Sequence, residues 1–131
     1  MKNLFNPGDK KTYRHQVRAA DTAVFESGPV HPVYATFALA RDAEWVCRLF
    51  VLEMKDEDEE GIGTMVSVYH HAPAAVGQTV EFTAEVISIK DNSILCRYEG
   101  KVGERLIASG EQEQKILKKE RLARLFQKIP E

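Results

Sequence analysis

The pair His70-His71 stands where an alternating strand pattern gives way to a turn rich in proline and glycine. Side chains of an extended segment point alternately to its two faces, so the two histidines face opposite ways. The apolar residues that share the face of His70 are Ile62, Val66 and Val68. An imidazole at the end of such a face is suited to acid–base chemistry near neutral pH. A core histidine satisfied by hydrogen bonds is the alternative interpretation.

Two further polar residues lie in the most apolar part of the chain. Thr36 opens a segment of helical periodicity that runs to about Met54, where its hydroxyl is a candidate N-cap or a substrate contact. Glu44 lies inside the same segment. Its carboxylate either pairs with Arg41 or Arg48 on the helix surface, or lies at the boundary between core and cleft. The second arrangement would make it a candidate catalytic group.

The helix expected over residues 36–54 is apolar on most of its circumference. Its apolar members are Phe37, Leu39, Ala40, Ala43, Val46, Cys47, Phe50, Val51 and Met54. A narrow polar stripe is left around Arg41, Asp42 and Arg48. A helix of this kind in a soluble protein must be covered by other structure.

Alternating patterns on both sides of this helix indicate strands. A half-exposed strand is expected over residues 11–24, and the acidic run 56–60 is interpreted as a loop. Four more strands are expected at residues 61–72, 78–90, 93–102 and 104–117. Their short connections favour antiparallel neighbours. The polar row 111–114 indicates that one end of the last strand lies at an edge or in solvent.

The pattern as a whole predicts a single α+β domain over residues 1–131. An antiparallel sheet of about five strands would wrap around one central apolar helix, which is the hotdog fold. Leu122, Leu125, Phe126 and Ile129 predict a short amphipathic C-terminal helix. Such a sheet leaves a flat edge that invites pairing with a second copy, so we expect a homodimer. Ferredoxin-like and cystatin-like domains are the alternative folds.

Composition excludes several classes of protein. The formal net charge of −2 gives no basic field for nucleic acid or a membrane surface. Cys47 and Cys96 lie in apolar patterns without CxxC spacing, which is typical of core residues in a reducing compartment. The four histidines lack metal-ligand spacing, so no metal site is expected. Residues 1–9 lack the apolar run of a signal peptide, and we expect a cytoplasmic protein.

Three segments of the chain match a known family. They are Val33-Tyr34-Ala35-Thr36, Glu44-Trp45-Val46-Cys47 and Thr64-Met65-Val66-Ser67-Val68-Tyr69-His70. With these segments the chain resembles the fluoroacetyl-CoA thioesterase-like family of hotdog proteins, roughly from Val30 to Lys115. The resemblance implies that Thr36, Glu44 and His70 are the catalytic set. Phe37 and Ala38 differ from the enzyme that hydrolyses the fluorinated substrate, so specificity for fluoroacetyl-CoA is not implied.

The resemblance and the residues together predict an acyl-CoA thioesterase that hydrolyses a small or medium acyl thioester. No cofactor is expected, because coenzyme A is part of the substrate. Gly77, Phe37 and His31 are expected to contact the substrate. The helix end near Thr36 would stabilise the oxyanion, and His70 would act as general acid or base.

Several points stay open at the level of the sequence. Glu44 either activates water or attacks the carbonyl to form an anhydride. The alternative enzyme is a hydratase or dehydratase acting on an acyl-CoA. The alternative outside catalysis is an acyl-CoA binding module without turnover.

Overall fold

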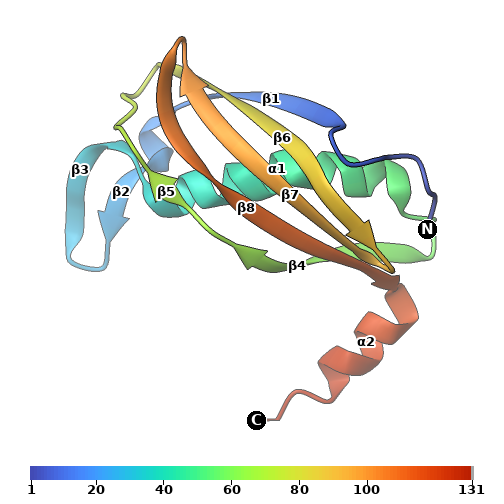
Figure 1. The fold of residues 1–131 in the computed structure, drawn as a ribbon. Coiled ribbons are helices and arrows are strands. Elements are labelled where there is room, and N and C mark those ends of the chain that lie inside the picture. The colour runs from blue at the N-terminus through green and yellow to red at the C-terminus, as the bar shows by residue number, and fades with distance from the viewer. Residues whose placement is uncertain (131) are drawn as a thin grey trace.

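Helix α1 (Thr36–Met54) lies along one face of a curled antiparallel sheet in the computed structural model, which describes residues 1–130 (Figure 1). The strands of this sheet are β1 (Lys10–Gln16), β4 (Glu59–Val66), β5 (Tyr69–His70), β6 (Thr79–Lys90), β7 (Ser93–Val102) and β8 (Arg105–Lys118). They follow the order β1-β6-β7-β8-β4, and β5 also pairs with β8. This confirms the predicted layout of a sheet wrapped around a central helix.

The sheet covers α1 on the side that carries its buried apolar residues. Leu39, Val46 and Phe50 are completely buried, and burial of each such side chain contributes about 1.5–3 kcal/mol. The opposite side of the helix is open. Its exposed or half-exposed residues are Thr36, Phe37, Ala40, Arg41, Glu44, Trp45, Arg48 and Leu52. We call this stripe the open face of α1.

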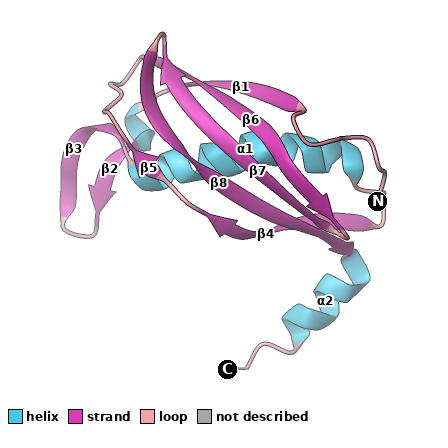
Figure 2. Ribbon diagram, viewed as in Figure 1, coloured by secondary structure: helices cyan, strands magenta, loops and turns pink. Residues whose placement is uncertain are grey.

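The expected strand over residues 11–24 is wrong in its second half. β1 ends at Gln16, and a short 3-10 helix, η1 (Ala19–Asp21), follows because the carboxylate of Asp21 folds back to accept the backbone N–H of Arg18 at 2.9 Å. Next come β2 (Thr22–Phe25) and β3 (Gly28–Tyr34), which pair in a separate hairpin. Figure 2 shows this hairpin beside the N-terminal end of α1. The turn is formed by residues 26–27, and Gly28, with φ of +107°, follows it as the first residue of β3.

The expected strand over residues 61–72 is divided into β4 and β5. A bulge lies between Gly63 and Met65, and it shifts the register against β8 by one residue. Before the bulge the odd positions face α1, because a Cβ on Gly61 would lie 2.6 Å from Val51. After the bulge the even positions do so. Val66 and Val68 therefore share the face of His70 as predicted, whereas the placement of Ile62 on that face is wrong.

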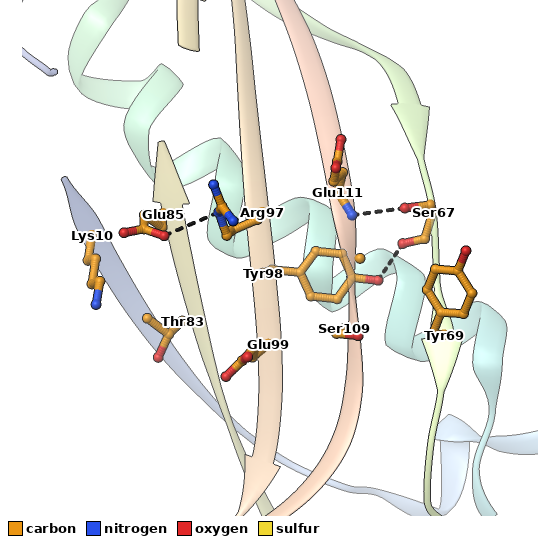
Figure 3. A pocket seen from close by; sticks show the side chains of 11 residues that line it. Lys10, Ser67, Tyr69, Thr83, Glu85, Arg97, Tyr98, Glu99, Ser109 and Glu111 are labelled. Carbon is orange, nitrogen blue, oxygen red and sulfur yellow. Dashed lines mark hydrogen bonds and ion pairs between the residues drawn. The ribbon is translucent and has the colours of Figure 1, made fainter. Parts of the chain in front are cut away.

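Ser67 marks the gap between β4 and β5. Its carbonyl accepts the hydroxyl of Tyr98 at 2.6 Å, and its own hydroxyl accepts the backbone N–H of Glu111 at 2.9 Å (Figure 3). The tyrosine reaches across Gly110, where a Cβ would lie only 2.1 Å from the Ser67 carbonyl oxygen. Because Gly110 has no side chain, the Tyr98 hydroxyl can reach the Ser67 carbonyl and hold the backbone before β5 in place.

Helix α2 (Lys119–Gln127) follows β8 and projects away from the sheet (Figure 1). It confirms the predicted C-terminal amphipathic helix. Leu122 is buried, while Leu125 and Phe126 are exposed. Among the helices of residues 1–130, none is long and apolar enough to cross a bilayer.

Candidate active site

Thr36 and His70 meet at the N-terminal end of α1. The Thr36 hydroxyl oxygen lies 3.0 Å from Nδ1 of His70, which is carried by β5. The N-cap role expected for Thr36 is wrong: Ala35 is the N-cap residue, with extended backbone angles, and Thr36 is the first residue of the helix. Its hydroxyl is therefore free to bind the imidazole instead of capping the backbone.

The first turn of α1 presents backbone donors at the same place. The first helical bond runs from the N–H of Leu39 to the carbonyl of Ala35, so the N–H groups before Leu39 have no partner within the helix. Within the described chain, no side chain caps this end. The free N–H groups and the positive end of the helix dipole therefore point toward the space beside His70.

The imidazole of His70 is half-buried. Within residues 1–130, its Nε2 atom is shielded from solvent and has no hydrogen-bond partner. Burial lowers the pKa of His70 from its ordinary value, and the neighbouring His71 adds to this effect. A lowered pKa keeps the ring neutral near pH 7, with one nitrogen able to accept a proton.

A cavity of about 550 Å³ lies against this pair. Its lining comes from the β2–β3 hairpin, the start of α1 and β5, and is made of Ala23, Phe25, His31, Val33, Tyr34, Ala35, Thr36, Phe37, Ala40 and His70. Phe37 and His31, both predicted to contact substrate, are among them. Phe25 packs edge-on against Phe37 at 5.8 Å between ring centroids, which joins the hairpin to the helix. The cavity suits an apolar group held beside a polar pair.

Glu44 lies on the open face of α1, two turns beyond Thr36 and about 12 Å along the axis. Gln112 donates to its Oε1 atom at 3.1 Å, and Gln114 donates to the carbonyl oxygen of Gln112's side chain at 2.9 Å. Across from it, a Cβ on Gly63 would lie 2.1 Å from the same Oε1 atom. Glu44 is not among the residues that line the cavity of His70.

The alternative surface ion pairs of Glu44 do not form within residues 1–130. Arg48 donates instead to Glu60 at 2.6 Å, and Arg41 binds the carboxylates of Asp21 and Asp42. The sequence pattern does not identify Gln112 and Gln114 as partners of Glu44, because it places one end of the strand with the polar row 111–114 at an edge or in solvent. Both glutamines are buried at 1% exposure, because β8 is an inner strand and its even positions in this row face α1.

Gly77 lies in the turn before β6, outside the lining of the cavity. Its φ of +92° is a left-handed conformation that favours glycine, and its N–H donates to the carbonyl of Val17 at 2.8 Å. The structure thus gives this glycine a conformational role.

A second hollow, of about 480 Å³, lies on the outer face of the sheet (Figure 3). Its lining includes the charged residues Lys10, Glu85, Arg97, Glu99 and Glu111, and Arg97 pairs with Glu85 at 3.2 Å. His71 also lies on this outer face, where its Nε2 atom is 2.7 Å from the hydroxyl of Ser109. The opposite orientation predicted for the two histidines is confirmed. Among residues 1–130, no group of three His, Cys, Asp or Glu side chains could hold a metal ion.

Comparisons with known proteins identify the family of this chain. The sequence profile of the family described as fluoroacetyl-CoA-specific thioesterase matches residues 17–120. A fluoroacetyl-CoA thioesterase from Streptantibioticus cattleyicolor is 30% identical over 99 residues, which cover 75% of this chain and 71% of the relative.

Two solved structures resemble this one closely. A hypothetical protein of Thermus thermophilus, described as a thioesterase superfamily member, superposes with a TM-score of 0.91 at 34% identity, covering 95% of this chain and 93% of its own. A fluoroacetyl-CoA thioesterase variant in complex with acetyl-CoA has a TM-score of 0.86 at 26% identity, covering 96% and 100%. The hotdog fold is thereby confirmed. The chain belongs to the fluoroacetyl-CoA-specific thioesterase family.

Proposed function

We propose that this protein is an acyl-CoA thioesterase that uses water to split an acyl thioester into a free acid and coenzyme A. The observation that carries the proposal is the Thr36–His70 pair at the uncapped start of α1, beside an apolar cavity. Membership of a thioesterase family supports the same reaction.

The start of α1 supplies electrostatic stabilisation. As water or a carboxylate attacks the thioester, negative charge develops on the carbonyl oxygen. Free backbone N–H groups before Leu39, together with the positive helix end, stabilise that oxyanion. The Thr36 hydroxyl holds His70 by its Nδ1 atom, and among the described residues Nε2 has no competing hydrogen-bond partner.

His70 and Glu44 divide the proton transfers. The neutral imidazole of His70 takes a proton from the nucleophile or returns it to the departing thiolate. Because Glu44 lies about 12 Å along α1 from Thr36 of the same copy, it is the second copy's Glu44 that reaches the thioester in a shared site. Held by Gln112, it either removes a proton from water or attacks the carbonyl and expels the thiolate, which leaves an anhydride that water then opens. Both routes end in the same products. Phe37 and His31 contact the acyl group, and the apolar lining favours a small or medium acyl chain without charge.

The active site is shared across a homodimer interface in this proposal. The open face of α1 exposes Phe37 and Trp45 at 50% and 40%, and the edge strand β4 exposes Met65 and Val66. A second copy placed against these surfaces would bury them in a symmetric contact. We further place the protein in the cytoplasm, since the buried cysteines Cys47 and Cys96 are both free thiols.

Release of free thiol from a panel of acyl-CoA esters tests the proposed reaction. We expect turnover of uncharged acyl chains, and a mass consistent with a dimer by light scattering. Saturable binding of every ester without thiol release would instead identify a non-catalytic acyl-CoA binding module.

A further inference from the structure

A group of charged side chains built around two buried carboxylates lies behind the active site and has no part in the chemistry proposed so far. We call it the Asp21 cluster. It consists of His15 from β1, Arg18 and Asp21 around η1, Tyr34 at the end of β3, and Arg41 and Asp42 from α1. Asp21 and Asp42 are 0% and 4% exposed, which is unusual for carboxylates.

Asp21 receives hydrogen bonds from several elements at once. Its Oδ1 atom accepts Arg18 Nη2 at 2.8 Å and Arg41 Nη2 at 3.0 Å. Its Oδ2 atom accepts the backbone N–H of Arg18 at 2.9 Å and lies 2.7 Å from His15 Nε2. Burial alone would raise the pKa of Asp21, but these bonds hold it well below its usual range. The carboxylate is thus a fixed negative charge that ties β1 and α1 to η1.

Asp42 extends the cluster to the residue before the N-cap. Arg41 bridges the two carboxylates, since its Nη2 atom also donates to Asp42 at 2.9 Å. The hydroxyl of Tyr34 donates to Asp42 as well. The Tyr34 ring stacks on His15, with centroids 5.8 Å apart. Tyr34 also lines the active-site cavity, so the Asp21 cluster packs directly behind one wall of that cavity.

The backbone of Asp21 completes the connection. Its carbonyl accepts the N–H of Ala35, the N-cap of α1, at 2.8 Å. Thr36 is the next residue, and its hydroxyl contacts His70. Asp21 therefore holds the N-terminal end of α1 through its backbone, while its side chain is held in place by the cations around it.

We propose that Asp21 is a positioning residue for catalysis: it fixes the start of α1 so that the Thr36 hydroxyl and the helix N–H groups meet His70 in the reactive geometry. The inference rests on the proposed thioesterase function for its kinetic readout. Asp21 acts through Thr36 and does not touch the substrate.

The first test is kinetic. Asp21→Asn replaces an acceptor oxygen with an amide that faces donors, while Asp58→Asn removes an exposed pair with Lys118 and serves as the matched control. We expect about a tenfold fall in kcat with KM within about twofold for Asp21→Asn, and no change for the control. In a Thr36→Ala background, Asp21→Asn should lower kcat less than about twofold. Multiplicative losses in the double variant would overturn the proposal.

A second variant covers the case in which Asp21→Asn does not fold. Arg41→Gln removes the bridge between the two carboxylates from a half-exposed position, and we expect the same pattern of a lower kcat at constant KM and the same non-additivity with Thr36→Ala. An unchanged kcat in this variant would contradict the proposal.

The third readout needs no activity and separates this inference from the proposed function. Imidazole ¹⁵N resonances of His70 report its contact with Thr36. We expect Thr36→Val to shift them, Asp21→Asn and Arg41→Gln to shift them in the same sense, and Asp58→Asn to leave them unchanged. His70 resonances that ignore the cluster variants would refute the positioning role even if thiol release is observed.

Discussion

The hydroxyl of Thr36 lies 3.0 Å from Nδ1 of His70, although 34 positions separate the two residues in the chain. The contact joins the first turn of α1 to β5 and occupies one of the two imidazole nitrogens.

Removal of the Thr36 hydroxyl should lower the rate more than the affinity. We expect Thr36→Val, which keeps the shape of the side chain, to reduce kcat about ten- to hundredfold because His70 loses its partner. Thr36→Ser keeps the hydroxyl and should retain most of the activity. Steady-state thiol release measures both, and equal loss in the two variants would show that the hydroxyl is not the group that matters.

The two adjacent histidines should differ sharply. His70→Ala removes the proposed general acid or base and should cost about 10²–10⁴ in kcat. His71→Ala should have little effect, since His71 lies on the outer face against Ser109. Thiol release and circular dichroism of the two variants make the comparison. A similar loss of kcat in both variants would contradict the assignment of the catalytic role to His70 alone.

The pH profile should reflect the burial of His70. Its pKa is lowered, so the neutral form persists below the ordinary value of about 6.5. We expect kcat/KM to fall as the pH drops through this lowered pKa, with the acid limb below about 6.5. Between the lowered pKa of His70 in the folded protein and its ordinary pKa in the unfolded chain, the unfolded chain binds more protons. The free energy of unfolding therefore decreases as the pH falls through this range. The free energy of unfolding is measured by denaturation at a series of pH values. If it changes with a midpoint above pH 6.5, and if His70→Gln leaves that midpoint in place, the pH dependence belongs to another group.

Two glycines of β4 should respond differently to alanine. A Cβ at Gly63 would collide with the carboxylate of Glu44, an exposed side chain that can move away. Gly63→Ala should therefore lower activity with little change in stability. A Cβ at Gly61 would meet buried Val51 at 2.6 Å, so Gly61→Ala should cost about 1–3 kcal/mol of stability. Thermal unfolding and thiol release measured together distinguish them, and the reverse pattern would argue against a catalytic role for Glu44.

Much of the fold could be predicted because its signals are local. The period of 3.6 residues marks α1, and the period of two marks β6, β7 and β8, since one buried face imposes each repeat. The patterns alone leave ordinary structural roles open for Thr36 and His70, and it is the resemblance to the family that puts them in one catalytic set. Gln112 carried a usable signal as well, because it shares its parity with Ile116 on an inner strand.

Other features depend on contacts that leave no local pattern. A bulge of one residue near Gly63 reverses which positions of the strand face α1. Strict alternation therefore predicts the wrong face of the sheet for Ile62. The Asp21 cluster joins residues of β1, η1 and α1, and each carboxylate looks like a surface residue until the chain is folded. The N-cap of α1 was misplaced because Thr36 bonds to a distant histidine rather than to its own helix.

Ala40 lies one helical turn from Thr36 and one turn from Glu44, on the same stripe of α1. Its side chain is a single methyl group that lines the cavity, and it is only half-buried. A bulkier residue here would shorten the room for an acyl tail without displacing any group that reacts. Evolution of this scaffold toward shorter or longer substrates therefore has a place to act that leaves the reaction machinery intact.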